Sequence, residues 1–83
     1  MEIGTVTGSV WATRKARNLN GQTLLVVKTD QKRLVAADFV GAGTGDQVLL
    51  VTGSTARVYC PECPVDTAVV AILDQMEERH VRT

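Results

Sequence analysis

The sequence has few aromatic residues and no excess of charge of either sign. Aromatic residues make up 4% of the 83 residues, and they are Trp11, Phe39 and Tyr59. Nine Lys and Arg residues balance nine Asp and Glu residues. Proteins that bind nucleic acid or membrane surfaces usually carry a basic patch, and single-strand binders add stacking aromatics. The composition therefore argues against nucleic acid and membrane surfaces as partners.

Cysteine, histidine and long apolar runs are also scarce. The two cysteines, Cys60 and Cys63, are too few for the disulfide framework of a small secreted domain. No stretch has the length of a membrane-spanning helix or the layout of a secretory signal peptide. These absences predict a cytoplasmic protein.

The chain length predicts a single domain over residues 1–83. A chain of this size buries only about 60% of the surface of its unfolded state, so it is marginally stable alone. Hydrophobic residues make up 45% of the sequence although aromatics are rare. The core must consist mainly of Val, Leu, Ile and Ala, which favours strands.

Five segments read as strands separated by glycine-containing or polar loops: Glu2 to Thr13, Thr23 to Thr29, Leu34 to Phe39, Gln47 to Val51 and Thr67 to Asp74. Gly4 and Gly8 within the first segment suggest bends or bulges. The charged segment Gln75 to Thr83 fits a short helical turn, an arm or a frayed tail. The pattern predicts an all-β fold, a small closed or half-closed barrel with five strands.

Four of these strands are apolar on both faces, whereas a half-exposed antiparallel strand alternates apolar and polar residues. The runs are Leu24 to Val27, Leu34 to Ala37, Val48 to Val51 and Ala68 to Leu73. One face fills the barrel, and the chain has no long helix to cover the other. A second subunit is the simplest cover, so the pattern predicts an obligate oligomer.

The stretch Gly41 to Arg57, GAGTGDQVLLVTGSTAR, combines a glycine-alternating loop, an apolar strand and a second turn of small residues. Its GxGxG loop lacks the lysine and the long following helix that a phosphate-binding loop needs. A tight turn or a crowded contact is the favoured interpretation, because glycine permits positive φ and close backbone approach. In the second turn, Ser54 or Thr55 fits the cap of one helical turn.

The side chains that could take part in catalysis do not form a recognisable catalytic set. Ser54 lacks a GxSxG elbow, and the only histidine, His80, lies in the charged tail. Asp38, Asp66 and Asp74 are scattered near strand ends without a partner acid, base or metal motif.

Cys60 and Cys63 form a CxxC pair that could bind a metal or a redox partner, which is the main alternative function. Reduced surface thiols are the favoured interpretation, because only His80 and nearby carboxylates could complete a set of four ligands. Binding of single-stranded nucleic acid by the small barrel is a further alternative, for which the sequence offers little material.

The pattern GAGxGxxVLLVxGSxAR, from Gly41 to Arg57, resembles the EutN/CcmL family of bacterial microcompartment vertex proteins. Further matches are the Val6 to Val10 segment, Ala12 to Lys15 and Pro64 to Asp66, so the resemblance covers roughly Met1 to Asp74. Cys60 and Cys63 are not part of the family pattern. The order and spacing of the matched segments make the resemblance specific.

The resemblance implies a barrel like that of oligonucleotide-binding folds, assembled as a homopentamer. Such pentamers close the fivefold vertices of shells tiled by hexamer-forming shell proteins, a structural role without catalysis or cofactor. The implied subunit contacts and axis surface comprise Gly41, Ala42, Gly43, Thr44, Gly45, Gly53, Ser54, Thr55, Ala56 and Arg57. Arg57 would anchor the contact through its planar guanidinium. Arg14 and Lys15 are implied as a rim that meets hexamers.

Overall fold

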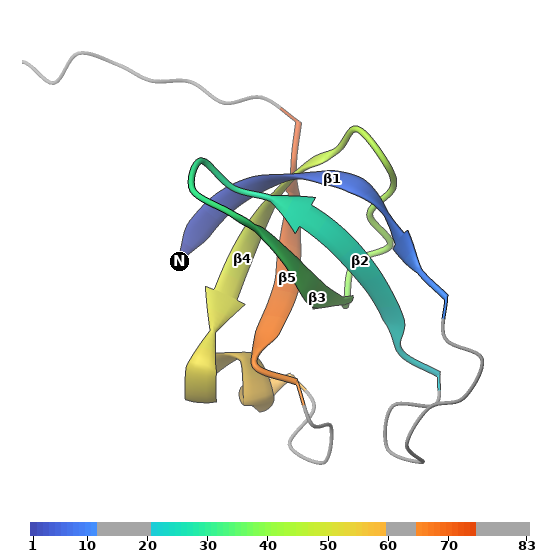
Figure 1. Ribbon diagram of the computed structural model, residues 1–83. Coiled ribbons are helices and arrows are strands. Elements are labelled where there is room, and N and C mark those ends of the chain that lie inside the picture. Colours follow the sequence, from blue (N-terminus) through green and yellow to red (C-terminus); the bar gives the residue numbers. More distant parts are fainter. Residues whose placement is uncertain (12–20, 60–64, 75–83) are drawn as a thin grey trace, which may run out of the picture.

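The computed structural model describes residues 1–11, 21–59 and 65–74, apart from the side chain of Arg57. Five strands follow in chain order: β1 (Glu2–Val10), β2 (Thr23–Lys28), β3 (Arg33–Asp38), β4 (Gln47–Thr52) and β5 (Thr67–Leu73). They close into a barrel in the order β1-β2-β3-β5-β4 (Figure 1). A 3₁₀ helix, η2 (Gly53–Val58), follows β4. The predicted all-β barrel with five strands and one short helical turn is confirmed, and it is closed.

Strand β1 joins two parts of the barrel because its two halves pair with different neighbours. Glu2 to Thr5 pair with β4, and Thr5 to Val10 pair with β2. The β1–β2 register shifts between Val6 and Gly8, so the bulge that Gly8 suggested lies next to it, at Thr7. Gly4 lies in regular pairing instead. A Cβ there would lie 2.5 Å from Cγ1 of Val27, so this glycine serves close strand packing.

The β2–β3 hairpin turns without the Asn-Gly pair that short hairpins prefer, because Thr29 holds the turn. Its amide donates to the carbonyl of Lys32 at 2.8 Å. Its Oγ1 accepts from the amides of Gln31 at 3.4 Å and Lys32 at 3.3 Å. A threonine hydroxyl that bonds to nearby backbone groups stabilises such a turn locally.

The barrel closes through a short parallel pairing between β3 and β5, at Ala37–Ala68 and Asp38–Val69. Inside it lies a core of alternating strand residues: Val6, Leu25, Val27, Ala36, Val48, Leu50 and Val69. A second cluster of Val51, Ala56 and Ala68, with Phe39 and Val70 against it, lies under η2. The closed core accounts for the apolar residues on one face of each strand. The 3₁₀ helix η2 covers part of the outer face of β4 and β5, and the rest of the outer face is left for other contacts.

Candidate subunit-contact site

The glycine loop runs from the end of β3 to the start of β4 and is held by two carboxylates. Asp38 Oδ1 accepts the amides of Val40 and Gly41, each at 3.1 Å, and Oδ2 accepts the amide of Ala42 at 3.0 Å. Asp46 Oδ2 accepts the amide of Gly43 at 2.8 Å. These bonds fix the loop backbone, because each amide that leaves water finds a charged acceptor.

The far end of the loop is joined to β1. The amide of Gly45 donates to the carbonyl of Val6 at 2.8 Å, and the amide of Val6 donates to the carbonyl of Asp46 at 2.9 Å. Ala42 packs against the main core, whereas Gly43, Thr44 and Gly45 are exposed. The loop is therefore an ordered surface feature, exposed at Val40 and Gly41 and again from Gly43 to Gly45.

Two of the three loop glycines meet a conformational need within the subunit. Gly41 and Gly45 have φ angles of +78° and +94°, which side chains of L-residues rarely adopt. Gly43 has no positive φ, and a Cβ there would meet only Asp46 Oδ2, at 3.9 Å. Nothing within the described subunit therefore requires glycine at position 43.

The second turn of small residues forms η2, which begins differently from the prediction. Thr52 is its N-cap and makes no side-chain cap bond, so the expected cap at Ser54 or Thr55 is wrong. Both residues lie inside η2 and are exposed. The chain enters the helix through Gly53 at φ +65°, and the Gly53 amide donates to the carbonyl of Asp66 at 2.8 Å. The glycine allows this reversal of direction, which no side-chain cap supports.

Ala56 is the predicted contact residue that the structure places inside the subunit. It is fully buried against Val51 and Ala68 and anchors η2 to the barrel. The backbone of Arg57 lies in η2. Of the described side chains in η2, Ser54, Thr55 and Val58 are thus exposed.

The two halves of the stretch Gly41 to Arg57 lie at opposite ends of β4 (Figure 1). At about 3.4 Å per residue, this strand separates them by about 17 Å. A subunit contact of about 800 Å² per partner is about 30 Å across, so one contact can still include both. The sequence motif therefore corresponds to two surface features of one barrel wall.

The remaining predicted site residues divide into those that the structure describes and those that lie outside the described ranges. Asp38 holds the glycine loop, which its position immediately before that loop could have indicated. Arg14, Lys15, Cys60, Cys63, His80 and the segment 75–83 lie outside the described residues. Within the described ranges, no three metal-binding side chains gather, and no helix is long and apolar enough to cross a membrane.

The fold is a small closed β-barrel, and its ordered, exposed glycine loop is a surface suited to protein contacts. Comparison with known proteins identifies it further. Residues 1–74 match the family model described as "Ethanolamine utilisation protein EutN/carboxysome", and the chain belongs to this EutN/CcmL family. The predicted family is therefore confirmed.

Individual relatives agree along almost the whole chain. The carboxysome shell vertex protein CcmL of Synechococcus elongatus is 44% identical, over 98% of this chain and 93% of the relative. A solved structure of the ethanolamine utilization protein EutN has a TM-score of 0.88 and 38% identity, over 94% of this chain and 91% of that one. The GrpN pentameric microcompartment shell protein from Rhodospirillum rubrum has a TM-score of 0.82 and 38% identity, over 96% and 100%.

These relatives confirm the predicted class of function. They are named as shell vertex or shell proteins of carboxysomes and other microcompartments, which are structural proteins. The chain is accordingly a structural shell protein and not an enzyme.

Proposed function

We propose that five copies of this chain form a ring that closes a fivefold vertex of a bacterial microcompartment shell in the cytoplasm. The observation that carries the proposal is the match of the barrel to the pentameric shell protein GrpN over nearly the full length of both chains. A head-to-tail contact between identical subunits generates a closed ring when its rotation fits. Five subunits supply the curvature that a flat sheet of hexamers lacks, so the mechanism is geometric.

The number of subunits in the assembly, measured from its mass, tests the proposed ring. Native mass spectrometry of the purified chain is expected to show a species of five subunits. Co-expression with a hexamer-forming shell protein is expected to give closed shells in electron micrographs, and omission of the chain is expected to leave shells open or extended. A monomer or dimer at micromolar concentration would refute the proposal.

Within this ring, we propose the exposed parts of the stretch Gly41 to Arg57 as contact and axis surfaces. Gly41 and the segment from Gly43 to Gly45 are exposed at one end of β4, and the segment from Gly53 to Thr55 is exposed at the other. Small exposed residues allow backbones of neighbouring subunits to approach closely. Ala42 and Ala56 support this surface from within, because they pack against the two apolar clusters.

Arg57 is proposed as the polar anchor of the subunit contact, as the family resemblance implies. Arg57→Ala is expected to raise the dissociation constant of the ring about tenfold or more, since arginines often dominate contact energies. Arg57→Lys retains the charge and loses the planar fork, so an intermediate effect would identify fork-like hydrogen bonding. An intact ring with Arg57→Ala would remove this role from Arg57.

The hexamer-facing rim is assigned by resemblance alone to Arg14 and Lys15. Their replacement by Glu is expected to leave the ring of five intact and to prevent its incorporation into shells. Sedimentation of the ring with preformed shells measures this step, with the unsubstituted ring as the control.

A further inference from the structure

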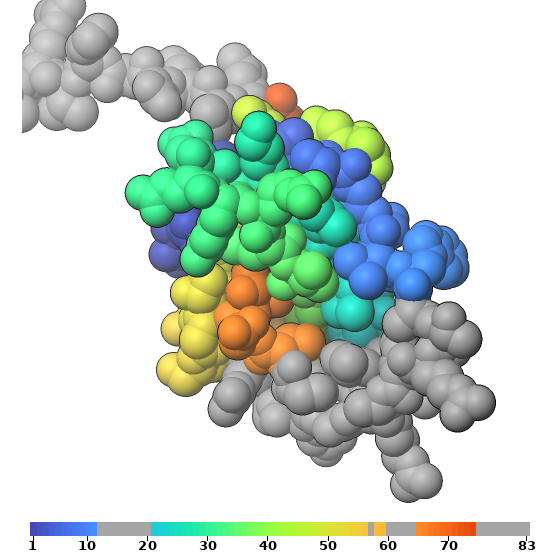
Figure 2. All heavy atoms as spheres, in the orientation of Figure 1, coloured from blue at the N-terminus to red at the C-terminus, as the bar shows by residue number. Residues whose placement is uncertain are grey.

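The outer side of β2 and β3 carries a surface that is both apolar and basic. Val26 lies opposite Val35, and Lys28 lies opposite Arg33, across the same strand pair. Between them on β2, Val27 is fully buried, so Val26 and Lys28 lie on the outer side of the strand. Val35 is 49% exposed. We call these four residues the basic face; Figure 2 shows β2 and β3, in teal and green, across the front of the molecule.

A second surface, around the beginning of β1, is apolar and acidic. Ile3 lies opposite Leu49 on β4 and is 48% exposed. Together with Met1, Glu2 and Asp30 they line a hollow of about 500 Å³. The charged side chains of this hollow are both acidic, and the amino group of Met1 leaves it net negative. Strand alternation directs Glu2 to the side of Leu50, at the mouth of the barrel, whereas Ile3 and Leu49 point outward, so the hollow lies at the rim. We call Met1, Glu2, Ile3, Asp30 and Leu49 the acidic face.

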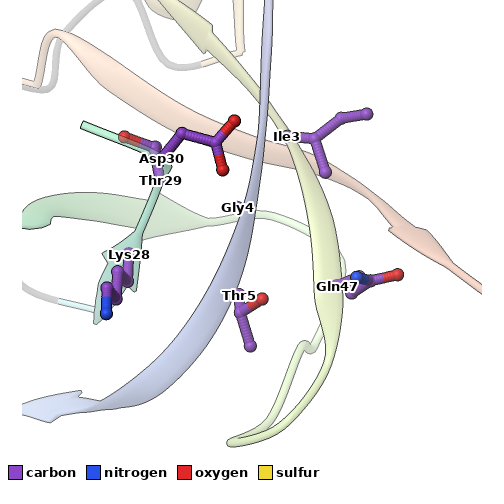
Figure 3. Close-up of a pocket in the computed structure, with 7 residues that line it drawn as sticks. All are labelled: Ile3, Gly4, Thr5, Lys28, Thr29, Asp30 and Gln47. Carbon is purple, nitrogen blue, oxygen red and sulfur yellow. The ribbon is translucent and has the colours of Figure 1, made fainter. Parts of the chain in front are cut away.

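The two faces meet at the β2–β3 hairpin and diverge from there. A hollow of about 610 Å³ lies between them and is lined by Ile3 and Asp30 from one face and Lys28 from the other. Figure 3 shows Ile3 and Lys28 on opposite sides of the β1 ribbon, with the ammonium group of Lys28 pointing away from Ile3. One subunit can therefore offer the two faces to two different neighbours.

The charges of both faces lack counterions within the described part of the chain. Lys28 and Arg33 lie directly opposite each other, and none of Lys28, Arg33, Glu2 and Asp30 has an ion-pair partner among the described residues. Like charges in opposite positions of a strand pair are mutually destabilising. Such an arrangement is tolerated when a partner brings the opposite charge, and here the other face of the same chain carries it.

We propose that, in the ring of five, the basic face of each subunit packs against the acidic face of the next. The proposal rests on the ring of the proposed function. A cyclic ring with more than two members joins two different surfaces of the same chain, head to tail. Val26 and Val35 would bury Ile3 and Leu49, while Lys28 and Arg33 meet Glu2 and Asp30, which combines an apolar centre with complementary charge.

The test introduces one charge into each apolar centre. Val35→Glu places a carboxylate against the acidic face, and Ile3→Lys places an ammonium group against the basic face. Each single variant is expected to raise the dissociation constant of the ring tenfold or more in native mass spectrometry over a dilution series. The double variant brings the two new charges together at every contact, so its ring is expected to be tighter than that of either single variant.

Ser9→Glu and Ser9→Lys are the matched controls, because Ser9 is exposed and lies on β1 outside the two faces. Both controls are expected to keep the ring. Circular dichroism verifies folding. If a charged variant does not fold, Arg33→Glu, Glu2→Lys and their combination replace the set, because these changes leave the core intact, and they are judged by the same outcomes.

Three results would overturn the pairing of the faces. The first is a Val35→Glu ring with wild-type affinity. The second is a double variant in which the two losses of ring affinity simply add. The third is a Val35→Glu ring that stays intact but no longer enters shells. The last result would assign the basic face to the hexamer-forming partner. A wild-type chain that forms no ring of five would instead refute the proposed function, which keeps the two failures distinct.

Discussion

At the scale of single residues, the three loop glycines differ in what each position demands. Gly41 and Gly45 adopt positive φ, so the turn itself requires them. Gly43 lies between them with an ordinary φ and free space around its missing side chain. Its amide bonds to Asp46, which a larger residue could do equally well. Any demand for glycine at position 43 therefore comes from outside the subunit.

Gly43→Val separates crowding by a neighbour from local backbone strain. We expect this variant to fold and to raise the dissociation constant of the ring about tenfold, equivalent to about 1.4 kcal/mol. Gly45→Val is expected to cost about 1–2 kcal/mol of subunit stability through its positive φ alone. Native mass spectrometry over a dilution series measures the ring, and circular dichroism verifies folding.

Ser9→Val is the matched control for this experiment, because it places the same side chain at an exposed residue of β1 outside the proposed contact surfaces. It is expected to assemble like the wild-type chain. If Gly43→Val also assembled with wild-type affinity, the loop glycines would serve local turns only.

At the scale of elements, β1 determines how tightly the barrel closes. The first residues of β1, Glu2 to Thr5, pair with β4, and the remaining residues, Thr5 to Val10, pair with β2. The two glycines of β1 lie in different surroundings. At Gly4 the strands approach so closely that a Cβ would lie 2.5 Å from Val27 and 3.0 Å from the carbonyl of Lys28, whereas at Gly8 no atom lies within 4 Å of that position.

Gly4→Ala and Gly8→Ala test this difference on one strand. We expect Gly4→Ala to destabilise the protein by about 1–3 kcal/mol, because the added methyl group overpacks the contact with Val27. Gly8→Ala is expected to be neutral or to stabilise by up to about 1 kcal/mol, since it restricts the unfolded chain without a clash. Urea unfolding at one protein concentration measures both, and equal losses would contradict the close approach at Gly4.

At the scale of the whole molecule, local sequence patterns predicted which segments form strands, but they did not predict how those strands are arranged in space. All five strands overlap the segments that composition indicated, although β1 ends at Val10, before the predicted end at Thr13. Strand formation follows composition over a few residues. The burial of Ala56 and the separation of the glycine loop from η2 depend on strand pairing across the barrel. That pairing is not encoded in any single segment. The same holds for the acidic and basic faces, each of which combines residues from different strands.

The stability of the whole molecule is expected to depend on assembly. A chain of 83 residues has a small core, and its exposed Ile3 and Val35 contribute apolar burial only in contact with a partner. If five folded subunits dissociate as they unfold, a tenfold rise in protein concentration stabilises each subunit by about 1 kcal/mol through mass action. For a domain of this size that amount raises Tm by about 4–8 °C.

Scanning calorimetry over a hundredfold range of protein concentration measures this coupling. The wild-type chain is expected to show a Tm that rises with each tenfold step. Val35→Glu, in which the ring contact is weakened, is expected to have a lower Tm than the wild type at every concentration, whereas Ser9→Glu follows the wild type. A wild-type Tm independent of concentration would mean that the barrel is stable without its neighbours, so that the outer apolar faces contribute to assembly but not to folding.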